Sequence, residues 1–254
     1  MHKHKQYPVR MPRPAGGIRA QEARGGAARS WWAMEWNRHL EAMGMKARLG
    51  RGRNYALSGQ VTSLAIETLA DSEYCGRPGR QAHEDARGTD CGRSGRQAHE
   101  GTRGTDCGRH GRQAHEGIRG TDCGRHGRVS ASVLGARAEP YTVTLDFRPV
   151  AGAARARLVA ALRADPMLVA RLLADDLPLE VAQLFRAEGF DLFPGGKLGP
   201  CRYDVTMACN CPDYANPCKH VAAVLILLGE EIARAPLRLL ELRGISLEEL
   251  IDES

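Results

Sequence analysis

The sequence predicts an α+β protein, and three observations support that class. Segments of alternating apolar and polar residues predict a small N-terminal β-meander, which follows a helix carrying all three tryptophans. Residues 150–193 have helical periodicity and predict a helical middle region. Residues 201–254 contain a Cys-x-Cys and a Cys-x-His pair before an apolar helix, which predicts a compact C-terminal unit of short strands plus helices. A repetitive insert interrupts the N-terminal region.

Residues 1–29 are predicted to be a disordered basic tail, because they are rich in Pro, Gly and Arg and lack periodicity. Residues 1–30 contain seven Lys and Arg residues against one acid, Glu22, so this segment alone carries the +6 net charge of the whole chain. A basic balance favours anionic partners such as nucleic acid. Here the excess positive charge lies mainly in the predicted tail and says little about the folded surface.

Residues 30–74 and 129–149 are predicted to form the N-terminal helix and the β-meander. Ser30 is the expected N-cap of a helix whose apolar residues predict a core-facing side, namely Trp31, Trp32, Trp36, Leu40 and Met43. Glycines at 50, 52 and 59 mark a change of period, after which a strand is expected from Gln60 to Thr68. The segments VSASVLG and YTVTLDF predict two further strands.

Residues 75–128 consist of nearly identical 16-residue repeats that begin at Cys75, Cys91 and Cys107, followed by a truncated copy from Cys123 to Arg128. Repeats that stack into a solenoid need apolar positions for a shared core. These units offer little besides Cys and Ala, so burial cannot offset an ordering entropy of about 1–2 kcal/mol per residue. We expect a disordered insert in a turn of the meander, where added length costs little.

The helical middle, residues 150–193, predicts three helices. Asp165 is the expected N-cap and Pro166 the first residue of the second helix, and the third should run from about Pro178 to Glu188 and stop at Gly189. Prolines and glycines between 194 and 200 predict a linker to the C-terminal unit.

The C-terminal unit contains a candidate metal site formed by Cys209, Cys211, Cys218 and His220. Residues i and i+2 of an extended segment point to the same side, so Cys209 and Cys211 can present two thiolates together. Three sulfurs and an imidazole suit tetrahedral Zn²⁺ and disfavour Mg²⁺ and Ca²⁺. Catalytic zinc keeps an open position for water, whereas four clustered protein ligands predict a closed, structural site.

The segment CNCPDYANPCKHVAAVLILLGEEI resembles the SWIM zinc finger, and more specifically the bacterial SWIM-domain proteins. The resemblance continues through WWAMEWNRHLEAMGMKARLGRGRNYALSGQV, GARAEPYTVTL and LLELRGISLEEL. It implies that the four residues named above are the zinc ligands. It also implies a non-enzymatic interaction module that binds DNA or protein, as a candidate accessory of a Swi/Snf-type helicase.

The nature of the partner stays open at this point. Lys197, Arg202 and Lys219 could reach phosphates near the finger. The acids that follow would repel DNA, namely Glu230, Glu231, Glu241, Glu248 and Glu249. The alternatives are a zinc-dependent hydrolase, although HExxH, Walker and nucleophile-elbow motifs are missing from the sequence, and a purely structural subunit.

The longest relevant apolar run, Val221 to Leu228, has eight residues, whereas a membrane helix needs about 20. We therefore expect no membrane association and a cytoplasmic location, in which the cysteines are thiols or metal ligands. We also expect that loss of the zinc would unfold residues 201–235 and leave the helical middle largely intact.

Overall fold

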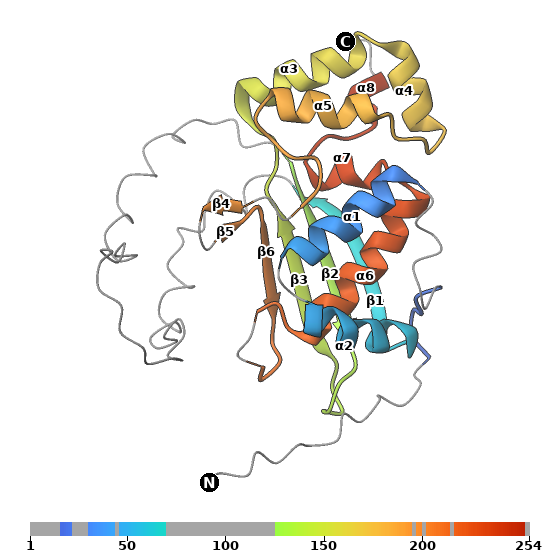
Figure 1. Ribbon diagram of the computed structural model, residues 1–254, viewed down its shortest axis with the longest axis vertical. Helices are drawn as coiled ribbons and strands as arrows, with labels where there is room; N and C mark the ends of the chain where they lie inside the picture. The colour runs from blue at the N-terminus through green and yellow to red at the C-terminus, as the bar shows by residue number, and fades with distance from the viewer. Residues whose placement is uncertain are drawn as a thin grey trace, which may run out of the picture.

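The computed structural model describes residues 16–21, 30–43, 46–69, 125–194, 197–199, 202–213 and 216–251. An antiparallel sheet carries helices on one face, and further helices gather at one end of the sheet (Figure 1). The predicted α+β class is confirmed. None of the helices in the described part of the chain combines the length and hydrophobicity that a bilayer crossing requires.

The sheet has four strands in the order β1-β2-β3-β6. These strands are β1 (Val61–Leu69), β2 (His126–Val133), β3 (Tyr141–Phe147) and β6 (Val205–Cys209). The first three form the predicted meander, with β2 and β3 in register from Arg128 opposite Asp146 to Val133 opposite Tyr141. The strand β6 comes from the C-terminal unit, yet it pairs with β3 along its whole length. Two regions that are distant in sequence therefore share one sheet.

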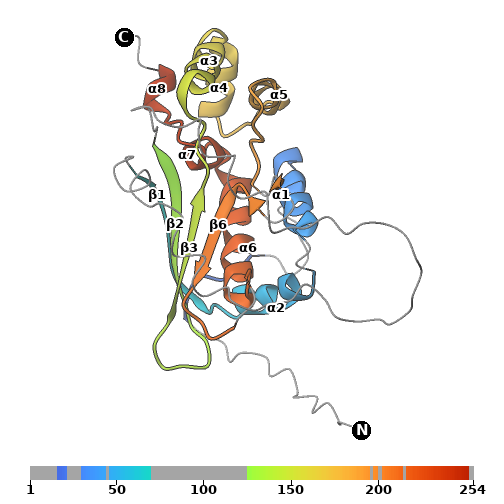
Figure 2. The same ribbon diagram turned by 90° about the vertical axis from the view of Figure 1, so that its left-hand side faces the viewer.

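Three helices cover one face of this sheet: α1 (Trp31–Ala42), α2 (Lys46–Leu57) and α6 (Lys219–Arg234). Figure 2 shows the sheet and the helices as two layers. The apolar helix α6 contacts both α1 and α2. Trp36 is buried against α6 and donates its indole N–H to the Leu225 carbonyl at 3.2 Å. Gly52 lets α2 approach α6 closely, because a Cβ at that position would lie 2.6 Å from the Cβ of Ala222.

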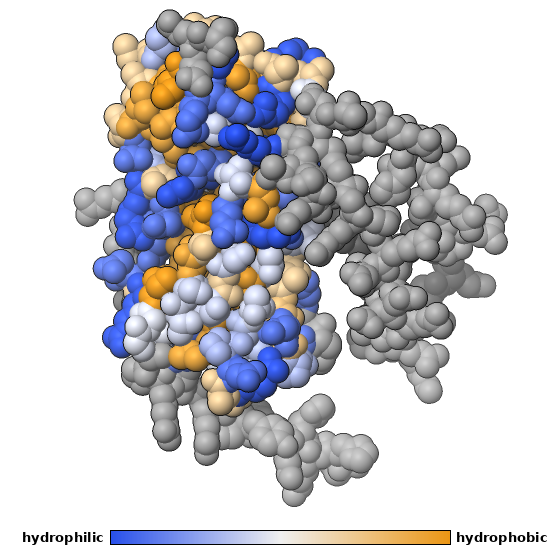
Figure 3. All heavy atoms as spheres, turned by 180° about the vertical axis from the view of Figure 1, so that it is seen from behind, coloured by the Kyte–Doolittle hydropathy of each residue, from blue (hydrophilic) through white to orange (hydrophobic). Residues whose placement is uncertain are grey.

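The opposite face of the sheet carries small hydroxyl residues. Alternation along β2 and β3 buries Val129, Ala131, Val143 and Leu145 beneath the helices. The intervening positions are only partly buried or exposed, and they pair across the strands as Ser130 with Thr144 and Ser132 with Thr142. Figure 3 views the molecule from this side, where pale residues of intermediate hydropathy gather over the sheet.

A second group of helices lies at one end of the sheet, at the top of Figure 1. The middle region contributes α3 (Gly152–Arg163), α4 (Pro166–Leu173) and α5 (Leu179–Ala187), and the C-terminal region adds α7 (Arg238–Leu242) and α8 (Glu248–Ile251). Asp165 caps α4 as predicted, because its carboxylate accepts from the backbone N–H groups of Met167 and Leu168 at 3.0 and 3.3 Å. Pro166 is the first residue of α4.

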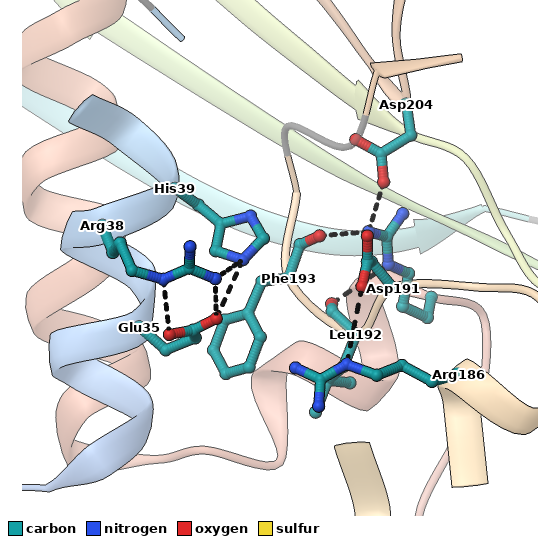
Figure 4. A network of polar contacts seen from close by, with 9 residues as sticks. Glu35, Arg38, His39, Arg186, Asp191, Leu192, Phe193 and Asp204 are labelled. Carbon is teal, nitrogen blue, oxygen red and sulfur yellow. Dashed lines mark hydrogen bonds and ion pairs between the residues drawn. The ribbon is translucent and has the colours of Figure 1, made fainter. Parts of the chain in front are cut away.

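A buried arginine joins this helical group to the sheet. Arg243 follows α7 and is only 2% exposed. Its guanidinium donates to the carbonyls of Leu192, Phe193 and Arg148 and forms an ion pair with Asp204, immediately before β6. Figure 4 shows Asp204, Leu192 and Phe193 close to one another, as these shared contacts with Arg243 require.

The structure differs from the sequence expectations within the N-terminal tail. Residues 16–21, which were expected to be disordered, lie beside the start of β1 and the end of α2. Ile18 bridges Val61, and Ala20 is buried and donates its N–H to the Ala56 carbonyl. Gly17 permits this contact, because a Cβ there would lie 2.6 Å from the Gly59 carbonyl oxygen.

Other differences concern element boundaries. Gly50 and Gly52 lie inside α2 instead of ending a helical segment, and Ser30 occupies the N-cap position of α1 without a side-chain capping bond. Two short strands, β4 (Lys197–Gly199) and β5 (Arg202–Tyr203), pair at the predicted linker and just after it.

The strand β2 starts at His126, so the last residues of the truncated repeat belong to the sheet. The close approach of Gly127 to Leu242 and the burial of His126 account for this boundary. Residues 75–124, which include most of the predicted insert, lie outside the described residues.

Candidate metal centre

The four predicted ligands come from the end of β6 and the start of α6. Cys209 is the last residue of β6. Asn210 continues the pairing with β3, since its side-chain oxygen accepts from the N–H of Thr142 at 2.9 Å and its own N–H donates to the Thr142 carbonyl at 3.3 Å. This extended conformation turns Asn210 away from Cys209 and Cys211, which lie on the other side of the chain.

The other two ligands lie where the chain returns as a helix. Cys218 is the N-cap residue of α6, and His220 lies in its first turn. The side-chain amide of Asn216 donates to the Met207 carbonyl and so ties the returning loop to β6. The Cys218 carbonyl accepts from the N–H of Ala222 in the first helical bond. The end of a strand and the start of a helix therefore each present two metal ligands.

The donor atoms converge on one point. The three sulfurs and a ring nitrogen of His220 all lie within 4.8 Å of one another. The Nδ1 atom of His220 lies 3.8 Å from the Cys209 sulfur and 3.7 Å from the Cys218 sulfur. Tetrahedral zinc, with Zn–S near ~2.3 Å and Zn–N near ~2.0 Å, separates its ligand atoms by about 3.5–3.8 Å. The donor types and their spacing fit Zn²⁺.

Ionisation of all three thiols would require a cation. The hydrogen bond between the thiols of Cys209 and Cys218 lowers the pKa of Cys218 to about 3 and raises the pKa of Cys209. Burial raises the pKa of Cys211. Three thiolates this close would repel one another, so the protein alone favours ionisation of one of them. A divalent cation offsets that repulsion and stabilises all three as thiolates.

Aromatic side chains hold the His220 ring, which is itself buried. The Tyr141 ring stacks on it at a centroid distance of 4.6 Å, and Tyr55 meets it edge-on at 5.3 Å. Gly135 leaves room for this stack, because a Cβ there would contact the Tyr141 ring. The buried Nε2 of His220 has no hydrogen-bond partner within the described part of the chain, so ring packing orients the imidazole.

Two cations flank these rings. The Arg137 guanidinium lies 4.2 Å from the centroid of the Tyr141 ring and donates to the Asn210 carbonyl at 3.3 Å. The Lys219 ammonium lies 5.5 Å from the Tyr55 ring. Cations over aromatic faces are attracted by about 0.5–2 kcal/mol. Sequence reasoning found Lys219 but missed the two tyrosines and Arg137, because no spacing rule relates them to the ligands.

The structure describes the side chain of only one of the three predicted phosphate-contacting residues. Lys219 lies beside the metal ligands, as its sequence position requires. Lys197 and Arg202 lie on β4 and β5, and their side chains are outside the described residues.

Comparison with known proteins agrees with the geometry. The SWIM zinc finger family model matches residues 204–229, which include all four candidate ligands. The uncharacterized protein Rv2102 of Mycobacterium tuberculosis (strain ATCC 25618 / H37Rv) is 29% identical over 245 residues, which cover 96% of this chain and 66% of that protein. The chain thus spans slightly less than two thirds of the length of this relative. No solved structure matches.

Proposed function

We propose that the SWIM zinc finger at residues 204–229 makes this chain a non-enzymatic interaction module that binds DNA or a protein. The observation that carries the proposal is the closed set of three cysteines and one histidine around a single point. Four protein donors complete a tetrahedral zinc site and leave no position for a reactive water. The metal therefore supplies conformational stability to the surface around it.

The placement of the finger supports a binding role. Its strand is an edge strand of the sheet, and Asn210 and Pro212 beside the ligands are exposed. Zinc that fixes the end of β6 and the start of α6 also fixes the loops between them. We propose that these loops and the adjacent basic residues contact the partner, with Lys197, Arg202 and Lys219 as candidate phosphate contacts.

The proposed setting is the cytoplasm, where the thiols of Cys209, Cys211 and Cys218 remain reduced and available to zinc. The proposed partner within the protein class is a Swi/Snf-type helicase, as the resemblance to SWIM fingers implies. Both parts of the proposal are tested by identifying what the chain binds.

The test is affinity capture with the wild type beside the Cys209→Ser/Cys211→Ser variant, together with measurement of bound zinc. A partner that depends on the finger is captured by wild type and lost with the variant. Leu172→Ala is the matched control, because it empties a fully buried position in α4 and destabilises the fold far from the ligands. The proposal fails if the cysteine variant keeps about one zinc per chain or captures the same partners as wild type.

A further inference from the structure

The helix α2 carries unpaired positive charge. Between residues 46 and 57 the sequence contains Lys46, Arg48, Arg51 and Arg53 and has no acidic residue. The side chains of the three arginines form no hydrogen bond or ion pair with the rest of the described chain. Several exposed arginines elsewhere are ion-paired, for example Arg157 with Glu188 at 2.6 Å. Arg51 and Arg53 are exposed, so their guanidinium groups remain available to an external anion, whereas Arg48 is partly buried and its buried Nε has no partner in the described chain.

One side of α2 faces the metal centre. At 3.6 residues per turn, Arg48, Arg51 and Tyr55 project within an arc of about 60° around the helix. Tyr55 contacts the ring of His220, so this side of α2 is the side toward the finger. Figure 1 shows α2 beside the beginning of α6, where the ligands lie. Arg53 projects from the other side of the helix.

Two cations from other elements lie beside the tyrosine rings that contact His220. Lys219 lies beside Tyr55, and Arg137, from the connection between β2 and β3, lies over Tyr141, which stacks on His220. We call Arg48, Arg51, Arg137 and Lys219 the basic surface. Glu139 and Asp213 are the acidic residues in the same loops, so the local balance is positive.

The acidic residues that seemed to oppose nucleic-acid binding lie elsewhere. The first of them, Glu230, occurs near the end of α6, a helix of 16 residues that is roughly 24 Å long. Glu231 pairs with Arg234 at 2.7 Å, and Glu249 pairs with Arg155 at 2.6 Å. The structure therefore separates these acids from the basic surface and neutralises several of them.

We infer that the basic surface binds the phosphodiester backbone of a nucleic acid, an inference that rests on the proposed interaction function and selects one class of partner. The cations are spread over α2, the start of α6 and a β-connection, which suits an extended polyanion better than a single phosphate group. Lys and Arg contacts to phosphates supply affinity without reading sequence. Zinc fixes the finger side of this surface, because Lys219 lies between two of its ligands.

The test is fluorescence anisotropy of the zinc-loaded full chain with a labelled DNA duplex and with its single strand, over a range of salt concentrations. Each phosphate contact contributes about 0.9 to the slope of log K against log salt for a duplex and about 0.7 for a single strand. Arg48→Gln/Arg51→Gln should lower the duplex slope by about 1.8, which weakens binding roughly 60-fold at ~0.1 M salt. The lower wild-type dissociation constant at a given salt concentration identifies the preferred form, because the slope differs between duplex and single strand even for equal numbers of contacts.

Arg157→Gln/Arg171→Gln is the matched control, because it removes the same charge from exposed, ion-paired residues of the helical middle. It should change affinity less than about twofold, since surface charges far from the contact are screened. If the double variant loses zinc or folded structure, Arg51→Gln alone tests the inference, with an expected loss of about 8-fold at ~0.1 M salt.

The inference is overturned if wild type binds neither nucleic acid at low salt, or if Arg48→Gln/Arg51→Gln binds like wild type. Capture of a zinc-dependent protein partner, without nucleic-acid binding, would overturn this inference and leave the proposed function intact. Equal loss of binding in the variant and its matched control would also contradict it, because net charge would then explain the result.

Discussion

Replacing Cys218 by serine should unfold more of the chain than the zinc finger itself. Cys218 is buried and is one of the four clustered ligands, and a serine hydroxyl is a poor zinc ligand. A structural zinc contributes on the order of 10–16 kcal/mol in small motifs, whereas whole domains are stable by about 5–15 kcal/mol. Loss of even part of the zinc contribution is therefore comparable with the stability of the entire fold.

The pairing of β6 with the sheet determines how much of the chain unfolds when the zinc is lost. The strand β6 is in register with β3 from Cys209 opposite Val143 to Val205 opposite Phe147. The helix α6 covers the same sheet and has nine buried residues, most of which belong to the hydrophobic core. Disorder in the finger would thus expose one edge of β3 and remove the central helix from the sheet. We expect loss of order throughout the sheet and in α1, in contrast to the local unfolding of residues 201–235 expected from the sequence.

Hydrogen–deuterium exchange with peptide resolution measures this directly. In Cys218→Ser, or in wild type treated with a chelator, amides of β2, β3 and α1 should lose protection together with those of α6. Ala208→Ser is the matched control: it places serine at an exposed position of β6 and should change stability by less than about 0.5 kcal/mol. Retained protection in β2 and β3, with loss confined to residues 205–225, would refute the reasoning.

Three further predictions concern stability. Arg243→Met should cost about 3–5 kcal/mol in urea unfolding, because it leaves the buried carboxylate of Asp204 without its ion-pair partner, and a cost below about 1 kcal/mol would contradict that role. Gly50→Ala should stabilise α2 by about 0.5–1 kcal/mol, whereas Gly52→Ala should cost about 1–3 kcal/mol, because only the second Cβ meets α6; thermal melts compare the two. The hydrogen bond from Arg38 lowers the pKa of Glu35 to about 2, so its stabilising effect is complete above about pH 4.5 and lost as pH falls toward 2. Glu35→Gln should therefore be less stable than wild type at pH 7, and this difference should shrink in melts at lower pH; a constant difference would exclude ionisation as its cause.

The strongest local signals in the sequence predicted their elements correctly. The alternation in YTVTLDF predicted β3, and Asp165-Pro166 marked the start of α4. The two Cys/His pairs predicted four donors that the structure brings to one point. Each of these predictions depends on residues close together in the chain, where spacing alone determines which side chains can meet.

The features that the sequence did not predict depend on contacts between distant residues. Gly50 and Gly52 weaken intrinsic helix propensity, so α2 could not be predicted without knowing that Gly52 packs against Ala222. The pairing of β6 with β3 joins residues on either side of the helical middle. Likewise, the stack of Tyr55 and Tyr141 on His220 assembles three segments and left no periodic signal.

Because β6 belongs to the central sheet, the zinc finger cannot be cut out of the chain at the limits of the matched motif without losing contacts that hold it. The family match at residues 204–229 ends inside α6 and leaves out β3, against which the first cysteine ligand is held. A fragment cut at those limits would leave β6 without its partner strand and would omit the last five residues of α6. The unit that has to stay intact is therefore larger than the matched motif, because it includes β3 and the whole of α6. A zinc ion bound by the four ligands would stabilise the whole sheet.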